Sequence, residues 1–153
     1  MSIEKVKEYF KKFNIEHRIQ EFDVSSATVE LAAKALNCEP DRIAKSLSFI
    51  VNDKPIIIVM SGNTKVSNSK YKQFFKVKAK MINFNDVENI IGHKAGGVCP
   101  FAINDGVEVY LDISLKNYKT VFPACGSSNS AIELSINELE DYSNFKSWID
   151  VGQ

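Results

Sequence analysis

The segment 45–60 restricts the fold more than any other part of the chain. Its first half alternates apolar residues with serines, which is the pattern of a half-buried strand. A polar turn at residues 52–55 follows, and then an uninterrupted apolar run, Ile56–Met60. The pattern predicts a hairpin whose second strand is buried. Because the strands of a hairpin are antiparallel, an all-parallel sheet is not expected.

Helical and strand patterns alternate along the rest of the chain. Helices are expected within 3–13, 29–36, 70–75 and 87–91, and from residue 136 onward. Strands are expected at 17–22, 45–51, 56–60, 77–81, 107–112, 120–124 and 131–134. Because no linker, repeat or low-complexity segment interrupts them, residues 1–153 are expected to form a single domain. We predict an α+β fold with a mixed, strongly curved or barrel-like sheet of about seven strands surrounded by helices.

Capping signals predict where two of the helices begin. Asn85 with Glu88, and Ser135 with Glu138, have the spacing of capping boxes, in which two side chains satisfy backbone N–H groups reciprocally. Gly92 is expected to end the first of these helices.

The formal charge of the chain is zero, from 19 basic and 19 acidic side chains. This balance excludes a strongly basic protein that coats nucleic acid regardless of sequence. The charges are nevertheless unevenly distributed along the chain. Residues 1–80 carry 15 basic and nine acidic side chains, whereas residues 81–153 carry four basic and ten acidic side chains. A polar partner could therefore meet one side of the molecule and not the other, unless the sequence halves do not form spatial halves.

The three cysteines are far apart and form no C-x-x-C pair. Neither a disulfide scaffold nor a zinc site is expected, and no cofactor is predicted. The start of the chain lacks the apolar stretch of a secretory signal, and no run approaches the ~20 apolar residues that span a bilayer. We expect a cytoplasmic protein with reduced thiols and no membrane partner.

Lys45 and a glycine loop are candidates for ligand binding. Alternation places the Lys45 ammonium on the same face as the apolar residues of its strand, at the strand's end, where it can meet a phosphate, a carboxylate or a developing oxyanion. In the loop 92–101, Gly96 and Gly97 let a ligand approach the main chain, whose N–H groups can face an oxyanion. A solvent-exposed lysine and a plain helix-to-strand connection are the structural alternatives.

Six lysines and no acidic residue lie between residues 65 and 80. Lys65, Lys70 and Lys72 are candidates for contacts with an RNA backbone, because clustered cations release counterions from phosphates. A solvated helix and strand would give the same pattern. The three aromatic residues within this segment have helical spacing, which is more typical of a core than of a base-stacking surface.

His93 and Cys99 share the glycine loop, so a thiol nucleophile with a histidine base is conceivable. No third group that would orient the histidine is evident, and an isolated cysteine is more often a small buried apolar residue. The polar loop 125–130 offers hydroxyls to a pocket, although hairpin turns commonly have this composition.

Several segments together resemble the YbaK/prolyl-tRNA-synthetase-associated domain family, the free-standing relatives of the editing domain inserted in bacterial prolyl-tRNA synthetases. They occur in the family's order and cover nearly the whole chain: Ser26–Leu36, Arg42–Leu47, Ser61–Gly62, Gly96–Phe101 and Ala124–Gly126. The combination of a lysine at a strand start, a glycine loop that ends in proline and a late glycine turn is more specific than any one segment.

The resemblance implies a barrel-like mixed sheet and a trans-editing hydrolase that cleaves the ester of mischarged aminoacyl-tRNA, classically cysteine or alanine on proline tRNA. It assigns catalysis to Lys45, Gly96 and Gly97. Substrate binding falls to Ser46, Val98, Cys99, Pro100 and Gly126. In the family, alanine-specific members tend to carry asparagine and cysteine-specific members threonine at the position of Ser46, so serine leans toward cysteine.

The partners implied are the tRNA acceptor end and prolyl-tRNA synthetase. Two other functions are weighed against this one. The first is a noncatalytic module that binds aminoacyl-tRNA ends or a synthetase, and the second is a hydrolase of small esters or amides that uses Cys99 as its nucleophile.

Overall fold

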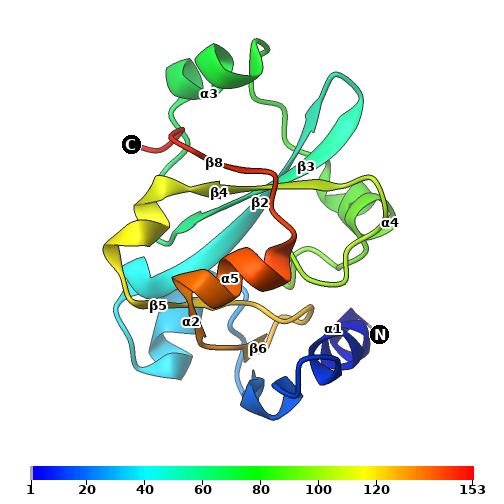
Figure 1. Ribbon diagram of the computed structural model, residues 1–153, viewed down its shortest axis with the longest axis vertical. Coiled ribbons are helices and arrows are strands. Elements are labelled where there is room, and N and C mark those ends of the chain that lie inside the picture. The colour runs from blue at the N-terminus through cyan, green and yellow to red at the C-terminus, as the bar shows by residue number, and fades with distance from the viewer. Residues whose placement is uncertain (1) are drawn as a thin grey trace.

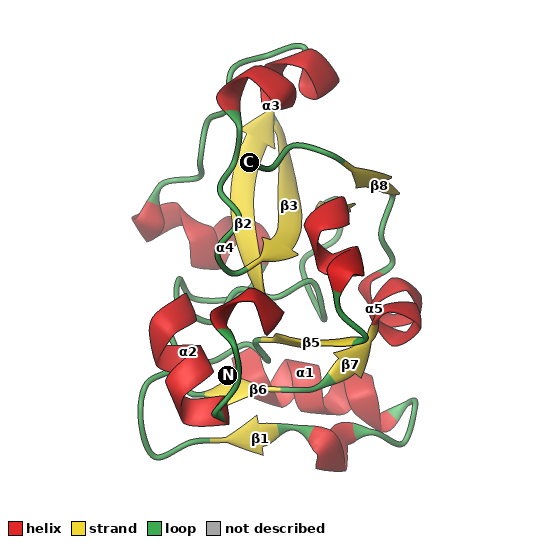
Figure 2. Ribbon diagram, turned by 90° about the vertical axis from the view of Figure 1, so that its left-hand side faces the viewer, coloured by secondary structure: helices red, strands yellow, loops and turns green. Residues whose placement is uncertain are grey.

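A mixed six-stranded sheet forms the centre of the computed structural model, which describes residues 2–153 (Figure 1). Its strands lie in the order β7 (Leu134–Ser135), β5 (Thr120–Pro123), β2 (Ile43–Val51), β3 (Lys54–Ser61), β4 (Glu108–Asp112) and β8 (Ser147–Ile149). A separate antiparallel pair joins β1 (Gln20–Glu21) to β6 (Ser130–Ala131). In Figure 2, β2 and β3 stand upright whereas β5 runs across the view, so the sheet curls along its width.

The β2–β3 hairpin is confirmed, with β3 in the interior of the sheet. The two strands pair antiparallel from Val51 with Lys54 to Ala44 with Ser61. The turn residues Asn52 and Asp53 have φ angles of 50° and 67°, a left-handed conformation that matches the twist of the two strands. The pairs β5–β2, β3–β4 and β4–β8 are parallel, so the prediction of a mixed, curled α+β sheet is also confirmed.

Five α-helices and four 3₁₀ turns surround the strands within residues 2–153. The α-helices are α1 (Ser2–Lys11), α2 (Val29–Leu36), α3 (Asn68–Phe75), α4 (Val87–Ile91) and α5 (Ile136–Ser143). The 3₁₀ turns are η1 (Glu16–Arg18), η2 (Pro40–Arg42), η3 (Phe84–Asp86) and η4 (Ile113–Asn117). The main core lies between the sheet and α1, α4 and α5, a second core lies under α3, and a third lies under α2.

Several predicted elements are corrected by the structure. Residues 77–81 form no strand, because only Met81 bridges to Phe49. The segment 17–22 begins with η1 and is extended only at β1. The strand expected at 131–134 is two short strands, β6 and β7, which belong to different sheets. β8 was not expected at all.

The two capping predictions have different outcomes. Ser135 and Glu138 form the full capping box at the start of α5. The box predicted for Asn85 is wrong, because η3 precedes α4 and Asp86 occupies the cap position without a side-chain hydrogen bond. The backbone N–H of Asp86 instead donates to the carbonyl of Asn83 at 2.9 Å. Gly92 ends α4 in a left-handed conformation, as predicted.

The two sequence halves are not spatial halves. β5 from the second half lies beside β2, and β4 lies beside β3. Four ion pairs join a base of the first half to an acid of the second, which are Arg18–Glu138, Arg42–Glu133, Lys54–Glu108 and Lys70–Asp150. Part of the charge asymmetry is therefore neutralised inside the fold.

The capping box of α5 gives an acid-dependent contribution to stability. Arg18 donates two hydrogen bonds to Glu138 and the Ser135 N–H donates a third, and these bonds hold the pKa of Glu138 at about 2. Because the folded pKa lies below the unfolded value, the contribution is complete above about pH 4.5 and is lost as the pH falls toward 2.

We expect Glu138→Gln to lower the free energy of unfolding at pH 7 by on the order of 1–2 kcal/mol, and to have little effect at pH 2.5. Urea unfolding at both pH values measures the difference. Glu88→Gln, at an exposed position on α4, is the matched control. An equal loss at both pH values would contradict the assigned cause.

Candidate functional site

A cavity of about 450 Å³ opens beside β2 at the point where β5 leaves it. The ladder between β2 and β5 has only two pairs, Ile43 with Phe122 and Ala44 with Pro123. Beyond them, β2 residues up to Ser48 line the cavity. Its other walls come from residues 26–32, from 81–87, from the glycine loop and from the segment 122–131.

Arg42 fixes the start of β2 against β5. Its Nε donates to the carbonyl of Thr120 at 3.2 Å, and its Nη2 donates to Glu133 Oε2 at 2.9 Å. The guanidinium also lies 4.9 Å from the ring centre of Phe122, within the range of a cation–π interaction. These contacts hold the two strands together at the cavity's edge.

The main chain of Ser46 lies on a free edge of β2. In an antiparallel pair, every second residue of a strand hydrogen-bonds to its partner strand through its N–H and C=O. Because Val51 and Lys54 flank the two-residue turn, the residues of β2 that bond to β3 are the odd-numbered ones. The even-numbered residues face the other side, where Ser48 O accepts from Ile82 N at 3.1 Å. Ser46 lies between this bond and the end of the β5 ladder, so its N–H and C=O face the cavity.

The Ser46 side chain adds a third polar group. Its Oγ is buried and has no hydrogen-bond partner among the described residues. A buried hydroxyl without a partner is unfavourable unless a ligand or water satisfies it. This atom is therefore available to a ligand in the cavity.

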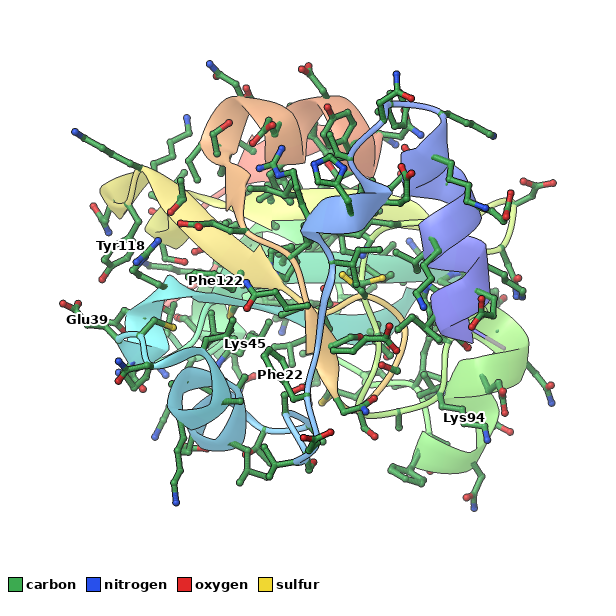
Figure 3. All side chains as sticks on the ribbon, turned by 90° about the horizontal axis from the view of Figure 1, so that it is seen from below. Phe22, Glu39, Lys45, Lys94, Tyr118 and Phe122 are labelled. Atoms are coloured by element: carbon green, nitrogen blue, oxygen red, sulfur yellow. The ribbon has the colours of Figure 1, made fainter. Side chains whose placement is uncertain are left out.

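Lys45 is half-buried and lines the cavity together with Phe122, near which it is drawn in Figure 3. Its Nζ donates a hydrogen bond of 3.0 Å to the carbonyl oxygen of Gly62, the residue that directly follows β3. A Cβ on Gly62 would lie 2.1 Å from the carbonyl oxygen of Pro40, so only glycine brings this carbonyl into place. Desolvation lowers the pKa of Lys45, the nearby Glu30 opposes that effect, and Lys65 adds to it.

The glycine loop contributes only some of its residues to the cavity wall. Gly96 and Val98 line the cavity, whereas Gly97, Cys99 and Pro100 do not. Gly97 packs against the loop 125–130, where a Cβ would lie 2.7 Å from the N of Ser127. Its own N–H donates to the carbonyl of Lys94 at 3.0 Å and is therefore engaged within the loop.

Cys99 lies in the main core and is completely buried, as is His93. The Nε2 of His93 lies 2.7 Å from the carbonyl of Phe101, so this nitrogen carries the proton and donates it to that oxygen. The same nitrogen is 3.5 Å from Cys99 Sγ and thus cannot accept the thiol proton. Burial raises the pKa of Cys99 to about 12 and lowers that of His93. The pair has the properties of a core contact.

The polar loop 125–130 mainly braces other parts of the site. Gly126 lies behind the cavity wall, against the first residues of α1. The hydroxyls of Ser127 and Ser130 bond to each other at 2.6 Å, and Ser128 O accepts from the backbone N–H of Ser26 at 2.7 Å. Of this loop, only Ser130 lines the cavity.

The three predicted RNA-binding lysines do not form one site. Lys65 is exposed and close enough to Lys45 to affect its pKa. Lys70 donates to the carbonyl of Gly152 at 2.8 Å and to Asp150 at 3.2 Å, which ties α3 to the end of the chain. Lys72 lies on α3 in a shallow hollow with Ser69, Gln73 and Lys76.

The sequence pattern missed several residues that line the cavity. Ser48 had a detectable signal, because it alternates with Ser46 on β2. Met81 and Phe84, which also line the cavity, had no detectable signal in the sequence. Met81 belongs to the segment 77–81, whose alternation resembles a strand, and Phe84 is a single apolar residue in the polar segment after it.

The sequence matches the model of the aminoacyl-tRNA editing domain over residues 23–142. The chain belongs to this family.

Relatives of this editing domain include free-standing proteins and parts of synthetases. The protein YwhH of Bacillus subtilis (strain 168) is 51% identical over 152 residues, which cover 99% of this chain and 97% of that protein. The proline–tRNA ligase of Caldicellulosiruptor saccharolyticus is 27% identical over 116 residues, which cover 75% of this chain. The editing domain matches only about a fifth of that ligase, 20% of its length.

Solved structures share the fold of the editing domain. A crystal structure described as "a putative trans-editing enzyme for prolyl tRNA synthetase" matches with a TM-score of 0.88 at 24% identity, covering 99% of this chain and 97% of the other. The hypothetical protein APE2540 matches with a TM-score of 0.86 at 25% identity, over 97% and 99% of the two chains.

Two further properties concern metals and membranes. Within residues 2–153 no group of three or more His, Cys, Asp or Glu side chains is placed to hold a metal ion. None of the helices in this part of the chain is long and apolar enough to cross a membrane.

The contact between the two loops predicts a strong effect of Gly97→Ala. Because the added methyl group would meet backbone atoms at 2.7–2.8 Å, the loops must move apart, and we expect a loss of about 1–3 kcal/mol in the free energy of unfolding. Urea unfolding measures it. Gly106→Ala reports the other cost of replacing a glycine, because its φ of +89° strains an alanine although no heavy atom lies within 4 Å of the added carbon. Unchanged stability in Gly97→Ala would contradict the contact.

Proposed function

We propose that the protein is a trans-editing deacylase that hydrolyses the ester of mischarged aminoacyl-tRNA, with proline tRNA carrying cysteine or alanine as the substrate. The main support is the position of a desolvated lysine beside a free strand edge in a cavity of about 450 Å³. Membership of the editing-domain family supports the same reaction.

The proposed mechanism needs no nucleophile from the protein. An aminoacyl ester is already activated, so binding its carbonyl beside N–H donors and admitting a water, or the substrate's own side chain, would suffice. The N–H groups of Ser46 and of Gly96 are the proposed donors, because both residues line the cavity. Gly97 would support this arrangement through its contact with Ser127 rather than through its own N–H.

Lys45 would hold the terminal nucleotide and stabilise negative charge that develops on the ester. In the described structure its ammonium contacts a neutral carbonyl and forms no ion pair. A cation in this state gains more from an incoming anion than one that a carboxylate already neutralises.

The Ser46 hydroxyl is proposed to favour a cysteine side chain over an alanine side chain. A thiol can hydrogen-bond to this buried oxygen, whereas a methyl group leaves it without a partner. Larger amino acids would be excluded by size. Size alone discriminates weakly, since one methylene is worth only about 1–3 kcal/mol.

A panel of mischarged tRNAs tests the proposed function. We expect the purified protein to release cysteine or alanine from proline tRNA and to leave prolyl-tRNA intact. A noncatalytic module would protect the ester from spontaneous hydrolysis instead. Protection of every member of the panel would therefore reject the deacylase and support binding alone.

Lys45→Ala is expected to reduce deacylation of the preferred substrate by at least about 100-fold, the scale of losing one well-placed electrostatic contact in an active site. Initial rates of amino-acid release measure the effect, and circular dichroism checks the fold. Lys119→Ala, at an exposed position outside both the cavity lining and the segment 65–80, is the matched control and should retain the wild-type rate. Full turnover in Lys45→Ala would remove the proposed mechanism.

Cys99→Ala separates this mechanism from a thiol hydrolase. Because Cys99 is buried and outside the cavity lining, we expect its replacement to leave the deacylation rate within about two-fold and to lower stability slightly, since a buried sulfur is lost. Loss of all turnover in a folded Cys99→Ala protein would instead support the thiol as nucleophile.

A further inference from the structure

Two large apolar side chains are exposed at the edge of the cavity. Phe84 is 76% exposed and Met81 is 57% exposed, yet both line the cavity. Phe84 is the most exposed large apolar side chain among residues 2–153. Exposed apolar side chains that are grouped at the edge of a cavity are more informative than single ones, because such groups mark ligand-binding grooves.

The segment that carries these side chains is held firmly. The N–H of Ile82 donates to Ser48 O at 3.1 Å, and Lys80 O accepts from Ile50 N at 2.9 Å, so β2 fixes the segment before Phe84. Ile82 and Val87 are buried on either side of it. The exposure of Phe84 is therefore imposed by the fold and is not a result of a loosely attached loop.

The charges around Phe84 differ on its two sides along the chain. Three exposed lysines, Lys76, Lys78 and Lys80, precede it, and two exposed acids, Asp86 and Glu88, follow it. Lys94, also exposed, directly precedes the lining residues Ala95 and Gly96. Lys80 and Lys94 each directly precede a residue that lines the cavity, so a polyanion at the cavity's edge meets positive charge there.

We propose that Phe84, supported by Met81, stacks on an unpaired base at the 3′ end of the tRNA, while the aminoacyl ester enters the cavity. This inference rests on the proposed function. An aromatic ring next to clustered cations is the combination by which proteins bind single-stranded nucleic acid without reading its sequence. A second copy of the chain is a poorer occupant, because two side chains bury far less than the ~800 Å² per partner of a stable interface.

The stacking step can be measured without catalysis. The probe is uncharged tRNA with 2-aminopurine in place of its terminal adenine, whose fluorescence falls when the base stacks. We expect the wild-type protein to quench this signal. Phe84→Ala should weaken binding by roughly 5- to 150-fold, the range found when a base-stacking aromatic residue is removed. Phe84→Trp should restore both the affinity and the quenching.

Phe74→Ala is the matched control for an exposed aromatic ring. Phe74 is 46% exposed and lies on α3 within the same lysine-rich segment, but it does not line the cavity. We expect this variant to bind and quench like the wild type. A loss in Phe74→Ala as large as that in Phe84→Ala would overturn the assignment, because it would show general attraction to the basic segment.

Other outcomes also decide the matter. Unchanged affinity and quenching in Phe84→Ala, or no binding of tRNA by the wild type, would overturn the inference. Concentration-dependent self-association that Phe84→Ala abolishes, with affinity for tRNA unchanged, would assign the surface to a second copy. Quenching that depends on Phe84, without hydrolysis of any mischarged tRNA, would support stacking and reject the proposed deacylase.

Discussion

The ladder between β2 and β5 ends after two residue pairs, and the cavity exists because it ends there. A longer ladder would use the N–H and C=O of Ser46 in sheet hydrogen bonds and would close the space that β5 leaves open. β3 pairs with the other edge of β2 from Ala44 to Val51, so the free edge is held firmly. Arg42 holds the two strands together just before they separate.

Lys45 differs from most of the cations that the fold uses for stability. Arg18, Arg42 and Lys54 each contact a carboxylate, whereas Lys45 contacts one backbone carbonyl and is desolvated by its surroundings. Partly burying a charge that no carboxylate contacts directly is unfavourable for folding. Proteins retain such arrangements mainly where a ligand supplies the missing charge, so the energetic cost supports the same site as the geometry does.

Local patterns predicted the parts of the fold that depend on local chemistry. The period-2 alternation gave the β2–β3 hairpin, although β2 begins at Ile43 and so places Lys45 inside the strand rather than at its end. The Ser135–Glu138 spacing gave the start of α5. The spacing of Asn85 and Glu88 failed because η3 supplies a competing backbone hydrogen bond to Asp86.

Features that depend on distant contacts were not predictable from the sequence. β8 is a strand because β4 lies beside it, and the segment 130–135 is divided because β1 and β5 take different parts of it. Within the glycine loop, Gly96 lines the cavity whereas Gly97 packs against Ser127, and the sequence alone does not distinguish these two roles. The exposure of Phe84 likewise follows from the bonds of Ile82 to β2 rather than from its neighbours in sequence.

The zero net charge is compatible with a locally basic surface because the ion pairs are unevenly distributed. Several bases of the first half of the chain are paired with acids of the second, but among the six lysines of the segment 65–80 only Lys70 forms an ion pair in the described structure. The unpaired lysines continue to Lys80, next to Met81 at the cavity's edge. A polyanion is therefore attracted at the cavity, while the neutral whole gives little attraction elsewhere, because exposed charges are screened beyond about 10 Å at 0.1 M salt.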